Sequence, residues 1–202
     1  MRVIQIEQRG GPEVLSLAEH PAPQPGSGQI VAEIAAAGVN YMDIYQREGV
    51  GGYRPPLPFV TGGEGAGTII AIGAGVTGLA VGDRVAWAAP GSYAEQVVVP
   101  ADRVVPVPDG ISTELAAAAL LQGMTAHYLV TSTYPVRAGD VTLVHAAAGG
   151  VGLLLTQMIK SLGGTVIATG TPEAIARSAG SYTGEYLKPK LKIARPAKAK
   201  SA

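Results

Sequence analysis

The 202-residue sequence contains no cysteine, and that absence excludes several kinds of site at once. Disulfide bonds, thiolate nucleophiles and cysteine-ligated zinc all require the missing side chain. Histidine does not take its place, because His20, His127 and His145 are scattered and share no metal-ligand spacing. The sequence therefore predicts no zinc site, and its lack of cysteine fits a reducing cytoplasm.

An excess of charge of either sign is also missing. Fifteen basic and fifteen acidic residues cancel to a formal net charge of zero, which gives no overall electrostatic reason to expect nucleic acid or an anionic membrane as partner. No apolar run reaches membrane-spanning length, and the alternating start Met1–Glu7 is unlike a signal peptide. We therefore predict a cytoplasmic protein with no membrane partner.

The first hundred residues are short β-type runs separated by glycine and proline, which predicts a small β-barrel-like domain. The expected strands are 3–6, 30–34, 67–72, 83–87 and 92–99. A short helix is expected over 39–47, followed by a mobile loop, 48–56, of a kind that can cover a cleft. Farther on, Ser112 is expected to cap a helix that carries the run Leu115–Leu121, and a second helix is expected over 124–130.

Residues 141–169 predict a strand, a glycine-rich turn, a helix and a second strand, which is the opening of a dinucleotide-binding fold. In the turn, the small residues Ala147, Gly149 and Gly152 permit a tight bend, close approach of a pyrophosphate and close packing of helix on strand. Gly150 and Val151 complete this predicted cofactor-binding turn. Thr169 stands where an NAD site usually has an acid, which favours NADP.

Six motifs in order support a closer resemblance. They are Gly38–Asp43, Gly62–Gly67, Gly82–Val85, Gly91–Glu95, Leu121–His127 and Ala146–Gly152. On these motifs the chain resembles the zinc-free, zeta-crystallin-like quinone oxidoreductases of the medium-chain dehydrogenase/reductase superfamily. Zinc-dependent alcohol dehydrogenases of that superfamily have a cysteine in the place of Asn40, a histidine in the place of Gly63 and a four-cysteine lobe. None of these ligands is present, so the resemblance also implies no zinc.

The resemblance implies a mixed α/β protein, with a GroES-like β-barrel domain over 1–122 and an incomplete Rossmann segment of a doubly wound parallel sheet over 123–170. The remaining residues, 171–202, are expected to form a basic tail that is either foreign to the family or diverged from it, and that is disordered. The resemblance further implies NADPH as cofactor and a quinone or enone as the small-molecule substrate, reduced without metal.

The same resemblance implies a role for particular side chains. Asn40, Tyr45 and Tyr53 would line the catalytic cleft, with an amide and two hydroxyls as hydrogen-bonding groups and two flat rings against the substrate. Gln122 and Thr125 would border the nicotinamide and its phosphates. For Asp43 and Glu64, which lie in the same motifs, holding the backbone or pairing with a cation is a better interpretation than proton transfer.

After Thr169 the sequence departs from the family, whose members supply further parallel strands. Residues 170–189 instead resemble the extreme carboxyl terminus of the ATP-binding subunit of the bacterial excision-repair excinuclease. We therefore expect a truncated Rossmann segment with an open sheet edge, and with it instability or a homodimer. Three functions stay open: an NADPH-dependent reductase, a non-catalytic remnant or interaction module, and weak nucleic-acid association through the basic tail.

Overall fold

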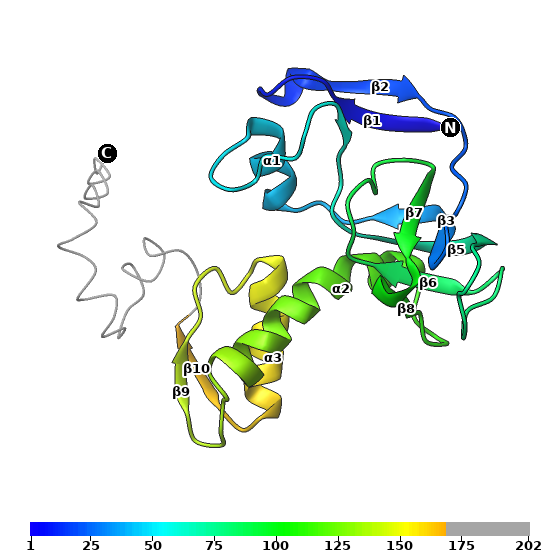
Figure 1. Ribbon diagram of the computed structural model, residues 1–202. Coiled ribbons are helices and arrows are strands. Elements are labelled where there is room, and N and C mark those ends of the chain that lie inside the picture. The colour runs from blue at the N-terminus through cyan, green and yellow to red at the C-terminus, as the bar shows by residue number, and fades with distance from the viewer. Residues whose placement is uncertain (169–202) are drawn as a thin grey trace, which may run out of the picture. The chain divides into compact units, whose positions relative to one another are not determined.

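Two antiparallel sheets build the first of the two units into which the chain divides, Met1–Leu121. The computed structural model describes residues 1–168, and the second unit begins at Gln122 (Figure 1). One sheet has the strand order β2-β1-β4 and the other β7-β3-β5-β6-β8. The strands are β1 (Arg2–Ile6), β2 (Leu15–Glu19), β3 (Gln29–Ala37), β4 (Phe59–Val60), β5 (Gly65–Ile72), β6 (Arg84–Trp87), β7 (Gln96–Pro100) and β8 (Val104–Pro106). Short 3-10 turns, η1 (Pro12–Val14) and η2 (Ala101–Arg103), connect them.

The core of this unit lies on the five-stranded sheet, where the long strand β3 pairs with β5 and β7. Its buried residues are Ile30, Ala32, Ile69, Val85, Trp87, Ala89, Val97 and Val99. Each of the valine and isoleucine side chains among them contributes about 1.5–3 kcal/mol by leaving water. The Trp87 indole N–H donates to Ser92 Oγ over 3.0 Å. Strand β7 begins at Gln96, so Ser92 lies before this strand, and the predicted strand over 92–99 is too long at its start.

Two helices belong to this unit in whole or in part. Helix α1 (Tyr41–Glu48) follows β3 and ends with Gly49 as its C-cap, close to the predicted helix over 39–47. Helix α2 (Thr113–Tyr128) begins after Ser112, whose Oγ accepts the Leu115 N–H over 3.2 Å, so the predicted cap is confirmed.

The prediction of two helices, ending at Leu121 and restarting at 124, is wrong. Helix α2 is continuous through this region and passes into a π-helical turn, η3 (Leu129–Thr133). The interruption was expected at the Gln122-Gly123 step. A glycine inside a helix costs only about 1 kcal/mol relative to alanine, which tertiary packing readily offsets.

The second unit contains the predicted strand, turn, helix and strand. Strands β9 (Val141–Leu143) and β10 (Thr165–Ala168) are parallel neighbours, and helix α3 (Gly150–Ser161) connects them. Its core cluster is Val130, Val144, Ala147 and Ile159. Thr169, the basic tail and the region similar to the excinuclease lie outside the described residues. The predicted domain limits at 122 and 170 stay predictions.

Candidate functional site

A hydrogen-bonded polar group lies at the start of α1 and links segments far apart in the sequence. Asn40 precedes the helix, and its side-chain Nδ2 donates to Glu64 Oε1 over 2.8 Å. Glu64 is fully buried at the start of β5, and its Oε2 accepts the backbone N–H of Leu121 over 3.1 Å. One carboxylate therefore connects the N-terminus of α1 to the middle of α2. This contact fits the interpretation of Glu64 as a residue that holds backbone.

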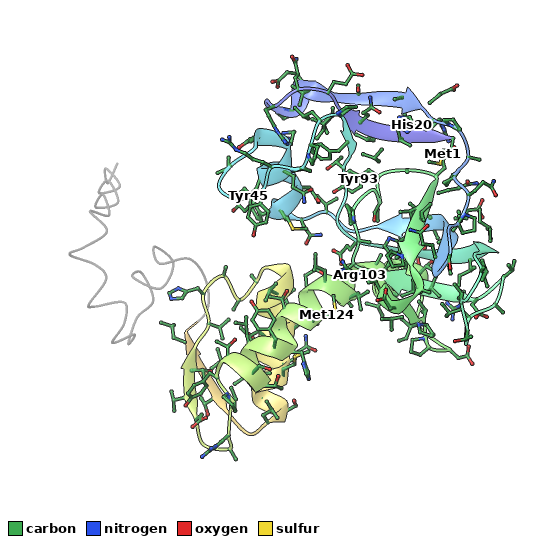
Figure 2. The ribbon with its side chains drawn as sticks, in the orientation of Figure 1. Met1, His20, Tyr45, Tyr93, Arg103 and Met124 are labelled. Carbon is green, nitrogen blue, oxygen red and sulfur yellow. The ribbon has the colours of Figure 1, made fainter. Side chains whose placement is uncertain are left out.

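Asp43 extends the group on the other side of Asn40. Its Oδ2 accepts the Asn40 backbone N–H over 2.8 Å and the Tyr93 hydroxyl over 2.8 Å, and the side chain is only 7% exposed. Burial of Tyr93, together with the neighbouring Asp43 carboxylate, raises the pKa of its hydroxyl well above the ordinary value. The Tyr93 hydroxyl thus remains a proton donor that supports Asp43. Figure 2 shows Tyr93 and also Tyr45 on α1.

The role of Tyr93 was not predicted, although its motif, Gly91–Glu95, was recognised. Its hydroxyl lies 2.8 Å from Asp43 Oδ2, across fifty positions of sequence. The one signal in the sequence was that both residues fall in motifs of the same family. Nothing in their spacing indicates that they meet.

Three tyrosine rings form a row on and after α1, which we call the tyrosine row: Tyr41, Tyr45 and Tyr53. The ring centroids of Tyr41 and Tyr45 are 6.4 Å apart, and those of Tyr45 and Tyr53 are 5.8 Å apart, with tilted planes. Tyr45 is 40% exposed and Tyr53 47% exposed, so both residues are partly accessible to solvent. The structure therefore brings together the two tyrosines predicted for the catalytic cleft. It adds Tyr41, which sequence reasoning missed.

The predicted cofactor turn lies between β9 and α3 in the second unit. Ala146 adopts a positive φ of 50°, and the Gly149 N–H donates to its carbonyl over 2.8 Å, which closes a tight turn. Gly149 is the N-cap of α3 and makes no side-chain cap hydrogen bond. A Cβ atom at Gly152 would overlap the Ala146 carbonyl oxygen and lie 2.5 Å from Ala147 Cα. Only glycine permits the helix to begin this close to the strand end.

Gln122 lies beside this turn, and Thr125 is one helical turn farther along α2. A Cβ atom at Gly150 would lie 3.1 Å from Gln122 Cγ, so the Gln122 side chain contacts the first residue of α3. The structure therefore places Gln122 against the predicted turn at Gly150. The turn and the first residues of α3 contain all five predicted residues: Ala147, Gly149, Gly150, Val151 and Gly152.

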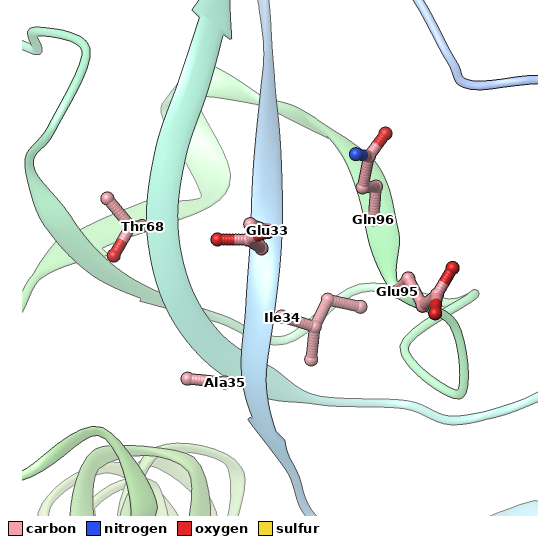
Figure 3. A pocket seen from close by; sticks show the side chains of 6 residues that line it. All are labelled: Glu33, Ile34, Ala35, Thr68, Glu95 and Gln96. Carbon is pink, nitrogen blue, oxygen red and sulfur yellow. The ribbon is translucent and has the colours of Figure 1, made fainter. Parts of the chain in front are cut away.

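A surface pocket of about 440 Å³ lies elsewhere, across β3, β5 and β7. Figure 3 shows its lining residues: Glu33, Ile34, Ala35, Thr68, Glu95 and Gln96. None of the predicted site residues within 1–168 is among them. Glu95 is engaged by Arg2, whose backbone N–H and side chain hold the pKa of the Glu95 carboxyl below its ordinary value.

Within residues 1–168, no three histidine, aspartate or glutamate side chains gather closely enough to hold a metal ion. Over the same range, no helix is both long and apolar enough to cross a bilayer.

Comparison with known proteins shows where the chain belongs. Residues 26–109 match the family described as the alcohol dehydrogenase GroES-like domain. A probable quinone oxidoreductase of Schizosaccharomyces pombe is 43% identical over 179 residues, which cover 88% of this chain and 54% of that protein. A 2-haloacrylate reductase of a Burkholderia species is 37% identical over 183 residues, which cover 86% and 54%. The structure of Escherichia coli quinone oxidoreductase complexed with NADPH matches with a TM-score of 0.81 and 37% identity, covering 93% of this chain and 56% of that one.

The chain is a member of the medium-chain dehydrogenase/reductase superfamily. Several of its homologues in that superfamily are quinone oxidoreductases, so the resemblance drawn from its motifs is confirmed. The predicted fold class, a mixed α/β protein with a GroES-like domain and a Rossmann segment, is confirmed as well. The chain spans about half the length of the curated relatives that it matches.

Proposed function

We propose that this chain carries the NADPH site and the substrate-binding side chains of a reductase that acts on a quinone or an activated alkene without metal. The observation that carries this proposal is the glycine turn at the N-terminus of α3, with Gln122 against Gly150. Two relatives support this proposal: one is a quinone oxidoreductase whose structure contains NADPH, and another is a 2-haloacrylate reductase.

The turn fits the pyrophosphate of a dinucleotide in shape and in charge. The first backbone N–H groups of an α-helix have no partner within the helix, and the helix dipole adds partial positive charge there. In α3 these groups belong to Gly150, Val151 and Gly152, and the N-cap residue, Gly149, has no side chain that could cap them. The absence of Cβ atoms at Gly149 and Gly150 leaves their backbone open to close approach, and both residues are exposed. These residues would hold the phosphates.

The remaining chemistry falls to the first unit. NADPH, when bound, supplies a hydride. The chain must then hold a planar acceptor and stabilise the negative charge that develops on its oxygen, which preorganised hydrogen-bond donors do in a metal-free site. We assign the donors to Asn40 and to the hydroxyls of Tyr45 and Tyr53, and the flat contact surface to the two tyrosine rings.

Glu64 and Asp43 act through Asn40 in this proposal. Glu64 holds the Asn40 amide nitrogen, and Asp43 holds the Asn40 backbone nitrogen. The amide is therefore oriented before a substrate arrives. Preorganisation of this kind spares the reorganisation that would otherwise be needed during the reaction.

Titration of the full chain with NADPH, followed by nicotinamide fluorescence with NADH as control, tests the cofactor assignment. The variant Gly150→Asp adds a negative charge at the first residue of α3, and we expect it to weaken NADPH binding at least tenfold. Ser161→Asp, at the exposed opposite end of α3, is the matched control and should bind like wild type.

Two outcomes would overturn the proposal. One is the absence of saturable NADPH binding by folded protein, which would favour the non-catalytic interaction module. The other is equal binding by Gly150→Asp and wild type, which would place the cofactor elsewhere. Turnover of a quinone and of 2-haloacrylate then decides between the two substrate classes. The basic segment behind the nucleic-acid alternative lies outside the described residues.

A further inference from the structure

Arg9 lies between β1 and η1, yet its side chain contacts a segment about forty positions later. Its Nη1 donates to the Gln46 carbonyl near the end of α1, and its Nη2 donates to the Pro55 carbonyl. The two acceptors lie on either side of the loop that carries Tyr53. One guanidinium group therefore connects both ends of this loop.

Further contacts fix the guanidinium in place. It lies over the Phe59 ring, with Cζ 5.4 Å from the ring centroid, in cation–π geometry. A Cβ atom at Gly49 would lie 3.1 Å from Arg9 Cδ, so the stem of Arg9 packs along the C-cap of α1. A further hydrogen bond connects the same two segments, because the carbonyl of Gly10 accepts the Arg47 Nε–H over 3.1 Å.

The loop between the two clamped ends is short and bonded within itself. The Val50 N–H donates to the Tyr45 carbonyl over 3.0 Å, and the Tyr53 N–H donates to the Val50 carbonyl over 3.2 Å. Through Val50, these two hydrogen bonds connect the Tyr53 backbone to Tyr45, whose ring lies beside the Tyr53 ring. The separation of the Tyr45 and Tyr53 rings, 5.8 Å, depends on how this loop closes.

We propose that Arg9 is a positioning residue that sets the Tyr53 ring against Tyr45 and thereby shapes the tyrosine row for a planar ring. The inference rests on the proposed function for its ligand, a quinone or another flat acceptor. Its consequence is selectivity: a flat bicyclic quinone needs both rings in place, whereas a small acyclic enone contacts little of them. Lysine cannot replace Arg9, because an ammonium group is a point charge and not a planar fork that reaches two carbonyls in fixed directions.

The first measurement is hydrogen–deuterium exchange of the peptide over 49–55 in the full chain, and it requires no activity. In Arg9→Lys we expect exchange about tenfold faster than in wild type, because a charge-assisted hydrogen bond is lost. Arg84→Lys is the matched control, since Arg84 also reaches two carbonyls, those of Ile111 at 2.7 Å and Pro108 at 3.3 Å. It should leave exchange over 49–55 unchanged.

The second measurement compares acceptors. For a naphthoquinone, we expect Arg9→Lys to raise KM about tenfold while kcat and the NADPH dissociation constant stay as in wild type. For a small acyclic enone, KM should change less than twofold. In Arg9→Ala, added guanidinium ion should restore the quinone KM in part, which a global loss of stability would not allow.

The outcomes separate this inference from the proposed function. Unchanged exchange over 49–55 in Arg9→Lys overturns the inference whether or not the chain reduces quinones. Faster exchange with an unchanged quinone KM, or an equal rise for both acceptors, overturns it as well. If wild type binds neither NADPH nor naphthoquinone in equilibrium titrations, the proposed function fails, and with it the assignment of a ring ligand to the tyrosine row. Faster exchange would then show Arg9 as a purely structural clamp.

Discussion

The two units build their candidate sites by opposite means. In the first unit, side chains from distant segments meet, as when Glu64 binds both Asn40 and Leu121. In the second unit, the site consists of backbone groups, and it depends on glycines that have no Cβ atom, above all Gly152. A site built from side chains tolerates graded changes, whereas a site built from close backbone approach tolerates almost none. This difference can be tested unit by unit, because the only tryptophan, Trp87, reports on the first unit alone.

The largest effect is expected in the second unit. In Gly152→Val, the new side chain would collide with the backbone of Ala146 and Ala147, and we expect the unfolding free energy of this unit to fall by about 3 kcal/mol. Far-UV circular dichroism during thermal unfolding should show the loss, while Trp87 fluorescence should keep its wild-type transition. Gly123→Ala, whose Cβ would make only an ordinary 3.9 Å contact, is the control. A common shift of both signals in Gly152→Val would mean that the units do not respond independently.

A smaller and graded effect is expected at Glu64. In Glu64→Gln, one oxygen becomes an N–H donor that faces either Leu121 N–H or Asn40 Nδ2, and the lost bond should cost about 2 kcal/mol. Here the Trp87 transition should shift. Glu33→Gln, exposed on β3, should leave it unchanged. Equal midpoints for Glu64→Gln and wild type would show that the buried carboxylate does not support the first unit.

Tyr93 sharpens the comparison through pH. Its raised pKa means that the folded state holds the hydroxyl proton more tightly than the unfolded state, in which tyrosine titrates near pH 10. Its contribution to stability is therefore complete below about pH 10 and is lost as the pH rises further. Tyr93→Phe should cost about 1 kcal/mol at pH 7 and should lose less stability than wild type between about pH 10 and 12.

Urea unfolding followed by Trp87 fluorescence at a series of pH values measures both quantities for Tyr93. Tyr134→Phe, exposed in the second unit, controls for the general effect of removing one tyrosine hydroxyl. Parallel stability curves for wild type and Tyr93→Phe above pH 10 would contradict the assigned pKa direction.

The smallest effect is expected at the surface ion pair of Arg2 and Glu95, in which Arg2 Nη2 lies 2.7 Å from Glu95 Oε1. Both side chains are well exposed, at 68% and 44%, so water and salt screen the pair. Arg2→Ala should shift the Trp87 transition less than Glu64→Gln or Tyr93→Phe does. The difference should vanish in 1 M sodium chloride, and a shift as large as that of Glu64→Gln would show that exposure is a poor guide to the weight of these contacts.

Much of the second unit could be predicted from sequence because a backbone site leaves a local signature. The spacing of Ala147, Gly149 and Gly152 indicated a tight turn, and the strand and helix on either side followed from apolar patterning. In the first unit the same patterning found the long strands, but β2, β4 and β8 were missed. Strand β4 has only two residues, and β8 pairs with β6, so both depend on contacts that no local pattern records.

The candidate site of the first unit could be predicted only as a set of residue types. Asn40 lies in a family motif, whereas Tyr45 and Tyr53 were assigned from the resemblance as a whole. The two tyrosine rings do lie side by side, and the catalytic role of all three residues stays a prediction. The partners that hold them were not found. Arg9 acts on a segment that begins 37 positions later, and Tyr93 on a carboxylate 50 positions earlier. Such pairs become visible only when the chain is folded.

Helix α2 has a practical consequence for taking this molecule apart. The boundary between the units, Leu121 to Gln122, falls inside this helix and not in an exposed linker, where domain boundaries usually lie. A fragment that stops at Leu121 would lose half of the helix, and one that starts at Gln122 would begin without its Ser112 cap. Separate expression of the two units therefore calls for overlapping fragments, each of which contains Thr113–Tyr128 entire, and limited proteolysis is a poor tool for finding this boundary.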